Sequence, residues 1–313
     1  MSNIIIAVDS GKYATKAVRR TPSGELKKIM FRTKMDDTNE TTTTDRRSCV
    51  VRIGGKSYMI GNSAETVDYE KSKAKEIHRI CAYTAVAKML EKGEKEVIMA
   101  VGCPLSIFSN VAERANYKNF FMEETDVVIS INGEKKDFTI KDVVVCPESS
   151  GIIFGHHKEY KNRMIGVIDI GGLNTNCAVY DRLNPVKSTM FTTNLGANIL
   201  TNDLKQLINS TFPDANIQDW QMENVIAQGY IKSNKVESAE LISNFFTKHF
   251  VNILDECKRK GWDLNNIDLV FVGGGSKLLE KEIHKLAPEG SAISPTAEWD
   301  NAEGFLTVGE MHV

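Results

Sequence analysis

Two aspartates each stand at the end of an apolar run and directly before a glycine-containing turn. Asp9 opens the segment 9–16, which contains one glycine. Asp169 opens the segment 169–175, which contains a glycine pair. Backbone that glycine adopts easily can present consecutive N–H groups to an anion, and a nearby carboxylate can hold magnesium through water. Both segments therefore predict loops that bind phosphate together with magnesium.

A third glycine-rich turn, Gly273-Gly274-Gly275-Ser276, follows an apolar strand predicted at 269–272. One such turn is weak evidence, because glycine-rich turns often serve only to redirect the chain. The three turns lie in two similar halves of the sequence, and two of them carry an aspartate. This pattern favours one nucleotide site to which both halves contribute.

Glu148 is the candidate for acid–base chemistry. It follows Pro147 and precedes a predicted helix start at 149–151, whose N–H groups are possible donors to an anion. A carboxylate in this place could orient a water toward a terminal phosphate and partly deprotonate it. A glutamate in a first helical turn also interacts favourably with the helix dipole, and this structural alternative stays open.

Lysines near these segments have two interpretations each. Lys12 could add a cation to the terminal phosphate or point to solvent. Lys16 could neutralise phosphate charge, although a single lysine on a hairpin is more commonly a surface residue. The basic stretch 71–75 is typical of a solvated face. The polar, Thr-rich segment 34–47 predicts a mobile surface loop, or a contact loop that becomes ordered against a partner.

Length and composition restrict the class of protein. A chain of 313 residues favours two lobes over one core, and 42% hydrophobic with 26% charged residues is typical of globular proteins. The net charge of -2 gives no general attraction to nucleic acid, so direct DNA binding is not expected. Six scattered cysteines without metal-ligand spacing predict buried thiols in a reducing compartment. We expect a cytoplasmic protein that does not contact membranes, since no signal peptide or bilayer-spanning run is evident.

The elements that must position these residues begin with a hairpin. Strands are predicted at 4–8, 15–20 and 26–33, so a strand and not a helix follows the first glycine turn. This order argues against a Rossmann domain, and the absence of GxxxxGK[ST] argues against a P-loop enzyme. Apolar spacing predicts further helices at 77–90, 106–118, 198–208, 239–260 and 278–286, a strand at 187–193 and a closing helix from 299.

Taken together, these residues resemble the superfamily of actins, sugar kinases and heat-shock chaperone ATPases over nearly the whole chain. Asp9-x-Gly11 with Lys16 resembles its first phosphate loop, and Asp169-x-Gly171-Gly172-x-Asn174-Thr175 its second. Val145-Cys146-Pro147-Glu148-Ser149 resembles the first connecting segment, and Gly273-Gly274-Gly275-Ser276 resembles the adenosine segment. Asn301-Ala302-Glu303-Gly304-Phe305 resembles the second connecting helix.

Within this superfamily the sequence is most similar to the plasmid-segregation actins, the ParM/StbA-like group. The similarity consists of the short length and three motifs: Tyr58-Met59-Ile60-Gly61 with Ala64, Gly102-x-Pro104-Leu105, and Asn301-Ala302-x-Gly304-Phe305. One departure is Lys12, because relatives often carry a small or hydroxyl residue there.

The resemblance implies an α/β, actin-like fold of two lobes, duplicated ribonuclease H-like domains, with Mg2+ and ATP or GTP in the cleft between them. The first lobe is expected at 1–150, with a small subdomain at about 31–80 and the helix 299–313 returning to it. The second is expected at 151–298, with a small subdomain at about 200–265.

The resemblance also implies residue roles. Asp9 and Asp169 would associate with the metal through water, and Glu148 would orient the attacking water; these three are the catalytic candidates. The residues expected to contact the nucleotide are Ser10, Gly11, Lys12, Tyr13, Lys16, Gly171, Gly172, Leu173, Asn174, Gly196, Gly273, Gly274, Gly275 and Ser276.

The function implied by the resemblance is an ATPase that forms polar filaments and disassembles on hydrolysis. Its partners would be other copies of the chain and a DNA-binding adaptor on centromere-like plasmid DNA. Two alternatives stay open. A small-molecule kinase of the same fold would need a sugar or acid site with an aspartate base, which the sequence does not identify. An actin-like scaffold with low turnover would need a membrane or peptide anchor, and no terminal amphipathic anchor is evident.

Overall fold

The computed structural model describes residues 4–68, 70 and 73–313, which divide into two compact units. Unit 1 is formed within residues 1–163, 180–187 and 298–313, and unit 2 within 164–179 and 188–297. None of the described helices is long and apolar enough to cross a membrane.

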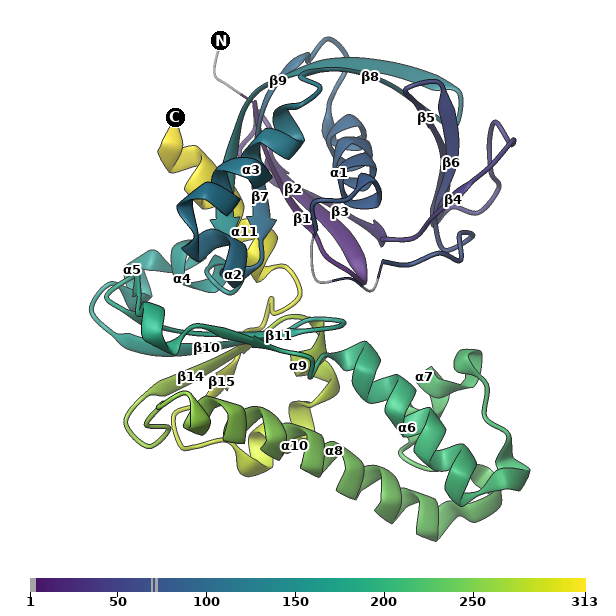
Figure 1. Cartoon of the computed structure of the whole chain (residues 1–313), viewed down its shortest axis with the longest axis vertical. Coiled ribbons are helices and arrows are strands. Elements are labelled where there is room, and N and C mark those ends of the chain that lie inside the picture. The colour runs from purple at the N-terminus through teal and green to yellow at the C-terminus, as the bar shows by residue number, and fades with distance from the viewer. Residues whose placement is uncertain (1–3, 69, 71–72) are drawn as a thin grey trace. The chain divides into compact units, whose positions relative to one another are not determined.

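Unit 1 contains a nine-stranded sheet in the order β3-β2-β1-β7-β9-β8-β5-β6-β4 (Figure 1). The central strands β1, β7 and β9 are parallel neighbours. On the other side of β1, the strands β2 and β3 follow in antiparallel order and end at the edge of the sheet. The predicted strand–turn–strand start is therefore confirmed. The strands are β1 (Ile4–Ser10), β2 (Ala14–Arg20), β3 (Leu26–Arg32), β4 (Met35–Asp37), β5 (Ser48–Ile53), β6 (Lys56–Gly61), β7 (Glu96–Cys103), β8 (Asp126–Ile131) and β9 (Glu134–Pro147).

Helices cover both faces of the central strands. Successive residues of a strand point to opposite faces, so Ile6 and Val8 join the core around α1, whereas Ala7 packs in the cluster of α11. The helix α1 lies inside the curve of the sheet (Figure 1). The helices of unit 1 are α1 (Glu76–Met89), α2 (Leu105–Ser109), α3 (Val111–Met122), α4 (Gly151–Gly155), α5 (His157–Tyr160) and α11 (Asp300–His312).

Unit 2 is built on a second sheet, in which β10 and β14 are parallel and central. Its strands are β10 (Met164–Ile170), β11 (Thr175–Asp181), β13 (Phe191–Thr193), β14 (Asp268–Val272) and β15 (Ala292–Ile293). The last two residues of β11 belong to unit 1, where they pair with β12 (Asn184–Pro185). The helices are α6 (Ala197–Thr211), α7 (Asp219–Gln228), α8 (Lys235–Arg259), α9 (Gly274–Leu278) and α10 (Glu280–Leu286), with 3-10 turns η1 (Lys187–Thr189), η2 (Pro213–Ala215) and η3 (Lys232–Asn234). The long helix α8 runs beside α6 (Figure 1).

Several local predictions need correction. The strand predicted at 187–193 is wrong in its first half, where the 3-10 turn η1 stands before the three residues of β13. The Thr-rich segment 34–47 is not wholly a loop, because β4 pairs with β6 at its start. The Asp36 carboxylate fastens this edge by accepting hydrogen bonds from the backbone of Glu65 and Thr66 at 2.6 and 3.1 Å. The prediction of buried thiols is confirmed for all six cysteines.

Candidate functional site

The parallel strands of unit 1 bring Asp9 and Glu148 to one edge of the sheet. Parallel neighbours end at the same edge, so the last residues of β1, β7 and β9 lie close together. Glu148 directly follows β9, and its N–H donates to the Cys103 carbonyl at the end of β7 at 2.9 Å. Asp9 and Glu148 are both buried, at 8% and 7% exposure. Two carboxylates predicted to act on one nucleotide thus lie at the same edge of the sheet, where β1, β7 and β9 end.

Lys73 contacts both carboxylates. Its Nζ lies 3.8 Å from Asp9 Oδ1 and is in direct contact with Glu148 Oε1, and its side chain is 7% exposed. The prediction of a solvated basic face at 71–75 is therefore wrong at Lys73, while residues 71 and 72 lie outside the described residues. Buried carboxylates require a compensating charge, and composition alone cannot distinguish a lysine that supplies it from a solvated one.

The first glycine turn is tight. A Cβ on Gly11 would lie 2.8 Å from the Ala14 carbonyl oxygen, so a side chain there would have to displace backbone. Tyr13, in the same turn, is 45% exposed, and the Arg32 guanidinium stacks 3.6 Å from its ring centroid. Lys16 donates to the Glu298 carbonyl at 2.5 Å. Lys16 therefore has a hydrogen-bond partner within unit 1, and its ammonium does not simply extend into solvent.

Lys12 does not point to solvent, so that alternative is wrong. Its Nζ donates to Asp68 Oδ2 at 2.6 Å and to the Glu70 carbonyl, and its side chain is 6% exposed. Asp68 also lies 3.0 Å from His78 Nε2, and the Nδ1 of the same ring lies 3.2 Å from Ser10 Oγ. Two residues of the first glycine turn are thereby linked to Asp68 by a polar network that sequence reasoning did not find.

The charge state of His78 in this network predicts a pH dependence of stability. Burial and, to a smaller extent, the positive charges of Lys73 and Lys12 lower the pKa of His78 to about 4, against the opposing effect of Asp68. The unfolded chain, with an ordinary histidine pKa of 6.5, binds more protons between pH 4 and 6.5. The contribution of neutral His78 to the free energy of unfolding is therefore complete above pH 6.5. It is lost as the pH drops toward 4, which lowers the free energy of unfolding by at most about 3 kcal/mol.

We expect His78→Gln to remove this part of the pH dependence. Denaturant unfolding between pH 4 and 7 measures it, with His284→Gln as the control, because that side chain is 69% exposed. An equal slope in wild type and His78→Gln would contradict the assignment.

Unit 2 brings Asp169 to the third glycine turn. Asp169 pairs with Val272 across the parallel strands β10 and β14 and is 4% exposed. Gly273 follows β14 with φ +82°, and a Cβ there would lie 2.5 Å from both Asp169 Oδ1 and the Ile170 carbonyl oxygen. Only glycine accommodates this backbone and this approach. The predicted turn at 273–276 ends early, because α9 begins at Gly274.

The turn after Asp169 is supported by the start of α6. The Gly171 N–H donates to the Asn174 carbonyl at 2.9 Å. The N–H groups of Ala197 and Asn198 donate to the carbonyls of Gly171 and Gly172 at 2.9 and 2.7 Å. A Cβ on Gly196 would lie 2.4 Å from the Gly172 oxygen and 2.3 Å from the Leu173 carbonyl carbon. The helix start thus fixes the backbone of the predicted second phosphate loop.

The predicted residues form one group in each unit. Within unit 1 the group contains Asp9, Ser10, Gly11, Lys12 and Glu148, and within unit 2 it contains Asp169, the turn 171–174, Gly196 and the segment 273–276. No cluster of three metal-binding side chains occurs among the described residues. Magnesium needs only one or two carboxylates when phosphate and water complete its shell, so buried aspartates beside glycine turns fit magnesium–nucleotide.

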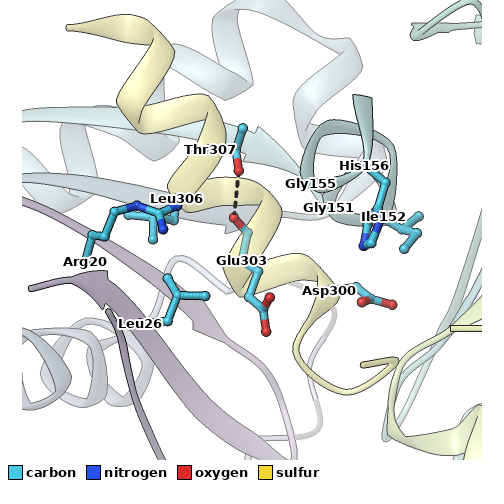
Figure 2. A pocket seen from close by; sticks show the side chains of 10 residues that line it. All are labelled: Arg20, Leu26, Gly151, Ile152, Gly155, His156, Asp300, Glu303, Leu306 and Thr307. Atoms are coloured by element: carbon cyan, nitrogen blue, oxygen red, sulfur yellow. Dashed lines mark hydrogen bonds between the residues drawn. The ribbon is translucent and has the colours of Figure 1, made fainter. Parts of the chain in front are cut away.

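A pocket of about 240 Å³ lies elsewhere in unit 1, around α11. Figure 2 shows Arg20 and Leu26 on one side of α11, and on the other side Ile152 of α4 and His156, which follows α4. The ten residues that line it include none of the residues predicted for the nucleotide site.

Comparisons with known proteins agree with an actin-like fold. Residues 7–151 match the family model of the N-terminal domain of actin-like proteins. No curated protein gives a significant match. The fold and this family model confirm the resemblance predicted from sequence, an α/β, actin-like fold of two lobes.

Solved structures extend the likeness over the whole chain. An Alp12 filament is 25% identical with a TM-score of 0.75, covering 100% of this chain and 99% of that one. A ParM filament of 15 strands from Clostridium botulinum is 17% identical with a TM-score of 0.79, covering 99% and 100%. An archaeal actin homologue in complex with ADP is 17% identical with a TM-score of 0.79, covering 98% and 99%.

Proposed function

We propose that this protein is a filament-forming ATPase that binds magnesium and ATP, with GTP as the alternative nucleotide. The observation that carries the proposal is the pairing of a buried aspartate with a glycine turn in each unit of an actin-like fold. The ADP complex of one structural neighbour and the filaments formed by two others support it. Plasmid segregation through a basic, DNA-binding adaptor in the cytoplasm is the biological role that we infer, since the net charge of -2 disfavours direct DNA contact.

In this proposal each carboxylate has its own task. Asp9 and Asp169 are the residues that would hold magnesium, and the ion would supply positive charge to the phosphates when it is bound. Glu148 orients a water and accepts its proton as the oxygen attacks the terminal phosphorus. The bond from that phosphorus to the bridging oxygen breaks, which leaves ADP and inorganic phosphate. Hydrolysis then changes the contacts between subunits, and head-to-tail contacts that do not close into a ring extend as an open helix.

Sedimentation with different nucleotides tests the proposed function. We expect the protein to pellet with ATP or GTP, or with a slowly hydrolysed analogue, and to stay in the supernatant with ADP. Electron microscopy of the pellet should show filaments, and phosphate release should accompany assembly. Failure to sediment at high protein concentration with the analogue would reject the filament, and phosphate transfer that depends on an added sugar would indicate a kinase.

Gly274 offers a test of the adenosine segment that leaves the fold intact. A Cβ on Gly274 meets no atom within 4 Å, whereas one on Gly275 would lie 2.4 Å from Ile170 Cγ2. We therefore expect Gly274→Leu to fold normally and to weaken ADP binding by about tenfold or more, since a 1.4 kcal/mol clash suffices. Calorimetry measures the affinity, with Lys277→Leu on the same short helix as the control. Unchanged affinity in Gly274→Leu would place the adenosine elsewhere.

A further inference from the structure

Lys73 is a buried cation at the edge of the sheet where Asp9 and Glu148 lie, and it contacts both carboxylates. The three side chains are each no more than 12% exposed, and they come from three separate stretches of unit 1. Lys12, by contrast, belongs to the Asp68 network described above. The lysine thus contacts the two carboxylates that the proposed function gives to the metal and to the attacking water.

A purely structural ion pair is a poor explanation for this arrangement. Burying three charged groups is costly, and apolar residues of similar volume usually stabilise a protein as well or better. A carboxylate that must receive a proton from water needs a fixed orientation, and a direct contact with a buried ammonium provides one. The same ammonium opposes a second cation at Asp9, because like charges at this distance repel strongly in a buried site.

We propose that Lys73 is a positioning residue of the nucleotide site. It holds the Glu148 carboxylate in the orientation needed to direct the attacking water, and its positive charge offsets part of the negative charge with which Asp9 attracts magnesium. This inference rests on the proposed function. Two consequences follow from it. Without Lys73, Glu148 loses its fixed orientation and turnover falls. At the same time Asp9 becomes a stronger magnesium ligand, so the reaction needs less magnesium.

Lys73→Met, Lys73→Arg and the control Lys75→Met test the proposal. Lys75 is a good control because it lies two residues away, is 33% exposed and pairs with Glu70. We expect Lys73→Met to lower kcat by about tenfold or more with KM changed less than about threefold, and to shift the magnesium titration to lower concentration. Lys73→Arg should recover most of kcat, and Lys75→Met should behave as wild type.

A stability measurement without nucleotide adds an independent arm. Lys73→Met leaves Glu148 buried without this cation, so we expect Lys73→Met/Glu148→Gln to unfold at a higher temperature than Lys73→Met alone. If Lys73→Met does not fold, the same kinetic and magnesium titrations on Lys73→Gln decide the question, because glutamine keeps a donor for Glu148 while removing the charge.

The outcomes separate the two proposals. A wild type that hydrolyses ATP beside a Lys73→Met variant with unchanged kcat and magnesium dependence would overturn the positioning role alone. A variant that is merely less stable, with normal kinetics, would do the same. A wild type that binds no nucleotide in calorimetry would remove the proposed function, and the role of Lys73 with it.

Discussion

Glu148→Gln is expected to slow phosphate release by about 100-fold or more while ADP affinity stays within about threefold of wild type. Glutamine has the shape of glutamate but cannot accept a proton from the attacking water. The nucleotide contacts that we propose for the glycine turns do not involve this side chain. Filaments assembled with ATP should consequently persist, because the step that we propose as the trigger of disassembly is blocked.

Single-turnover phosphate release and calorimetry provide the two measurements. Glu113→Gln is the control, since Glu113 is a glutamate of unit 1 that stands in the first turn of α3 and is exposed. Thermal unfolding of Glu148→Gln must be measured as well, because the substitution removes a partner of Lys73. Wild-type phosphate release by a folded Glu148→Gln variant would remove Glu148 from the mechanism.

Gly304→Ala is expected to lower the free energy of unfolding by about 3 kcal/mol or more. The helices α4 and α11 touch backbone to backbone, and a Cβ on Gly304 would lie 2.0 Å from the Gly151 carbonyl oxygen. The clash cannot be relieved by a side-chain rotation, because the obstructing atoms are main chain. Since α4 begins three residues after Glu148, a shift of this helix should also lower the rate of phosphate release.

Denaturant unfolding checks the size of this effect, and Gly155→Ala supplies the matched control. Gly155 lies on α4 as well, yet a Cβ there would come no closer than 3.8 Å to other atoms. Alanine at this position should be neutral or slightly stabilising, because it reduces the entropy of the unfolded chain. If Gly304→Ala and Gly155→Ala had equal stability, the close helix crossing would be contradicted.

Most of the secondary structure near the candidate site could be predicted because its signals are local. The hairpin of β1 and β2, the strand β10 and the helix α1 follow from apolar runs, their spacing and the glycines between them. Asp9 and Asp169 could be selected for the same reason, since each stands directly at the end of a predicted strand. Glu148 could be selected because it follows Pro147 and precedes a predicted helix start. The strand predicted at 187–193 failed in its first half, because a short segment rich in Ser and Thr does not distinguish a strand from a 3-10 turn.

By itself, then, the sequence predicted the two aspartate–glycine turns and the actin-like fold, and it singled out Glu148 as the acidic candidate. Tertiary structure alone decided which basic groups meet them. Lys73 and Lys75 stand in the same basic stretch, yet Lys73 is buried against Asp9 and Glu148 while Lys75 is partly exposed. The contact between Gly151 and Gly304 was likewise invisible in the sequence. The physical reason is that these contacts join segments far apart in the chain, whereas the sequence pattern reports only on near neighbours.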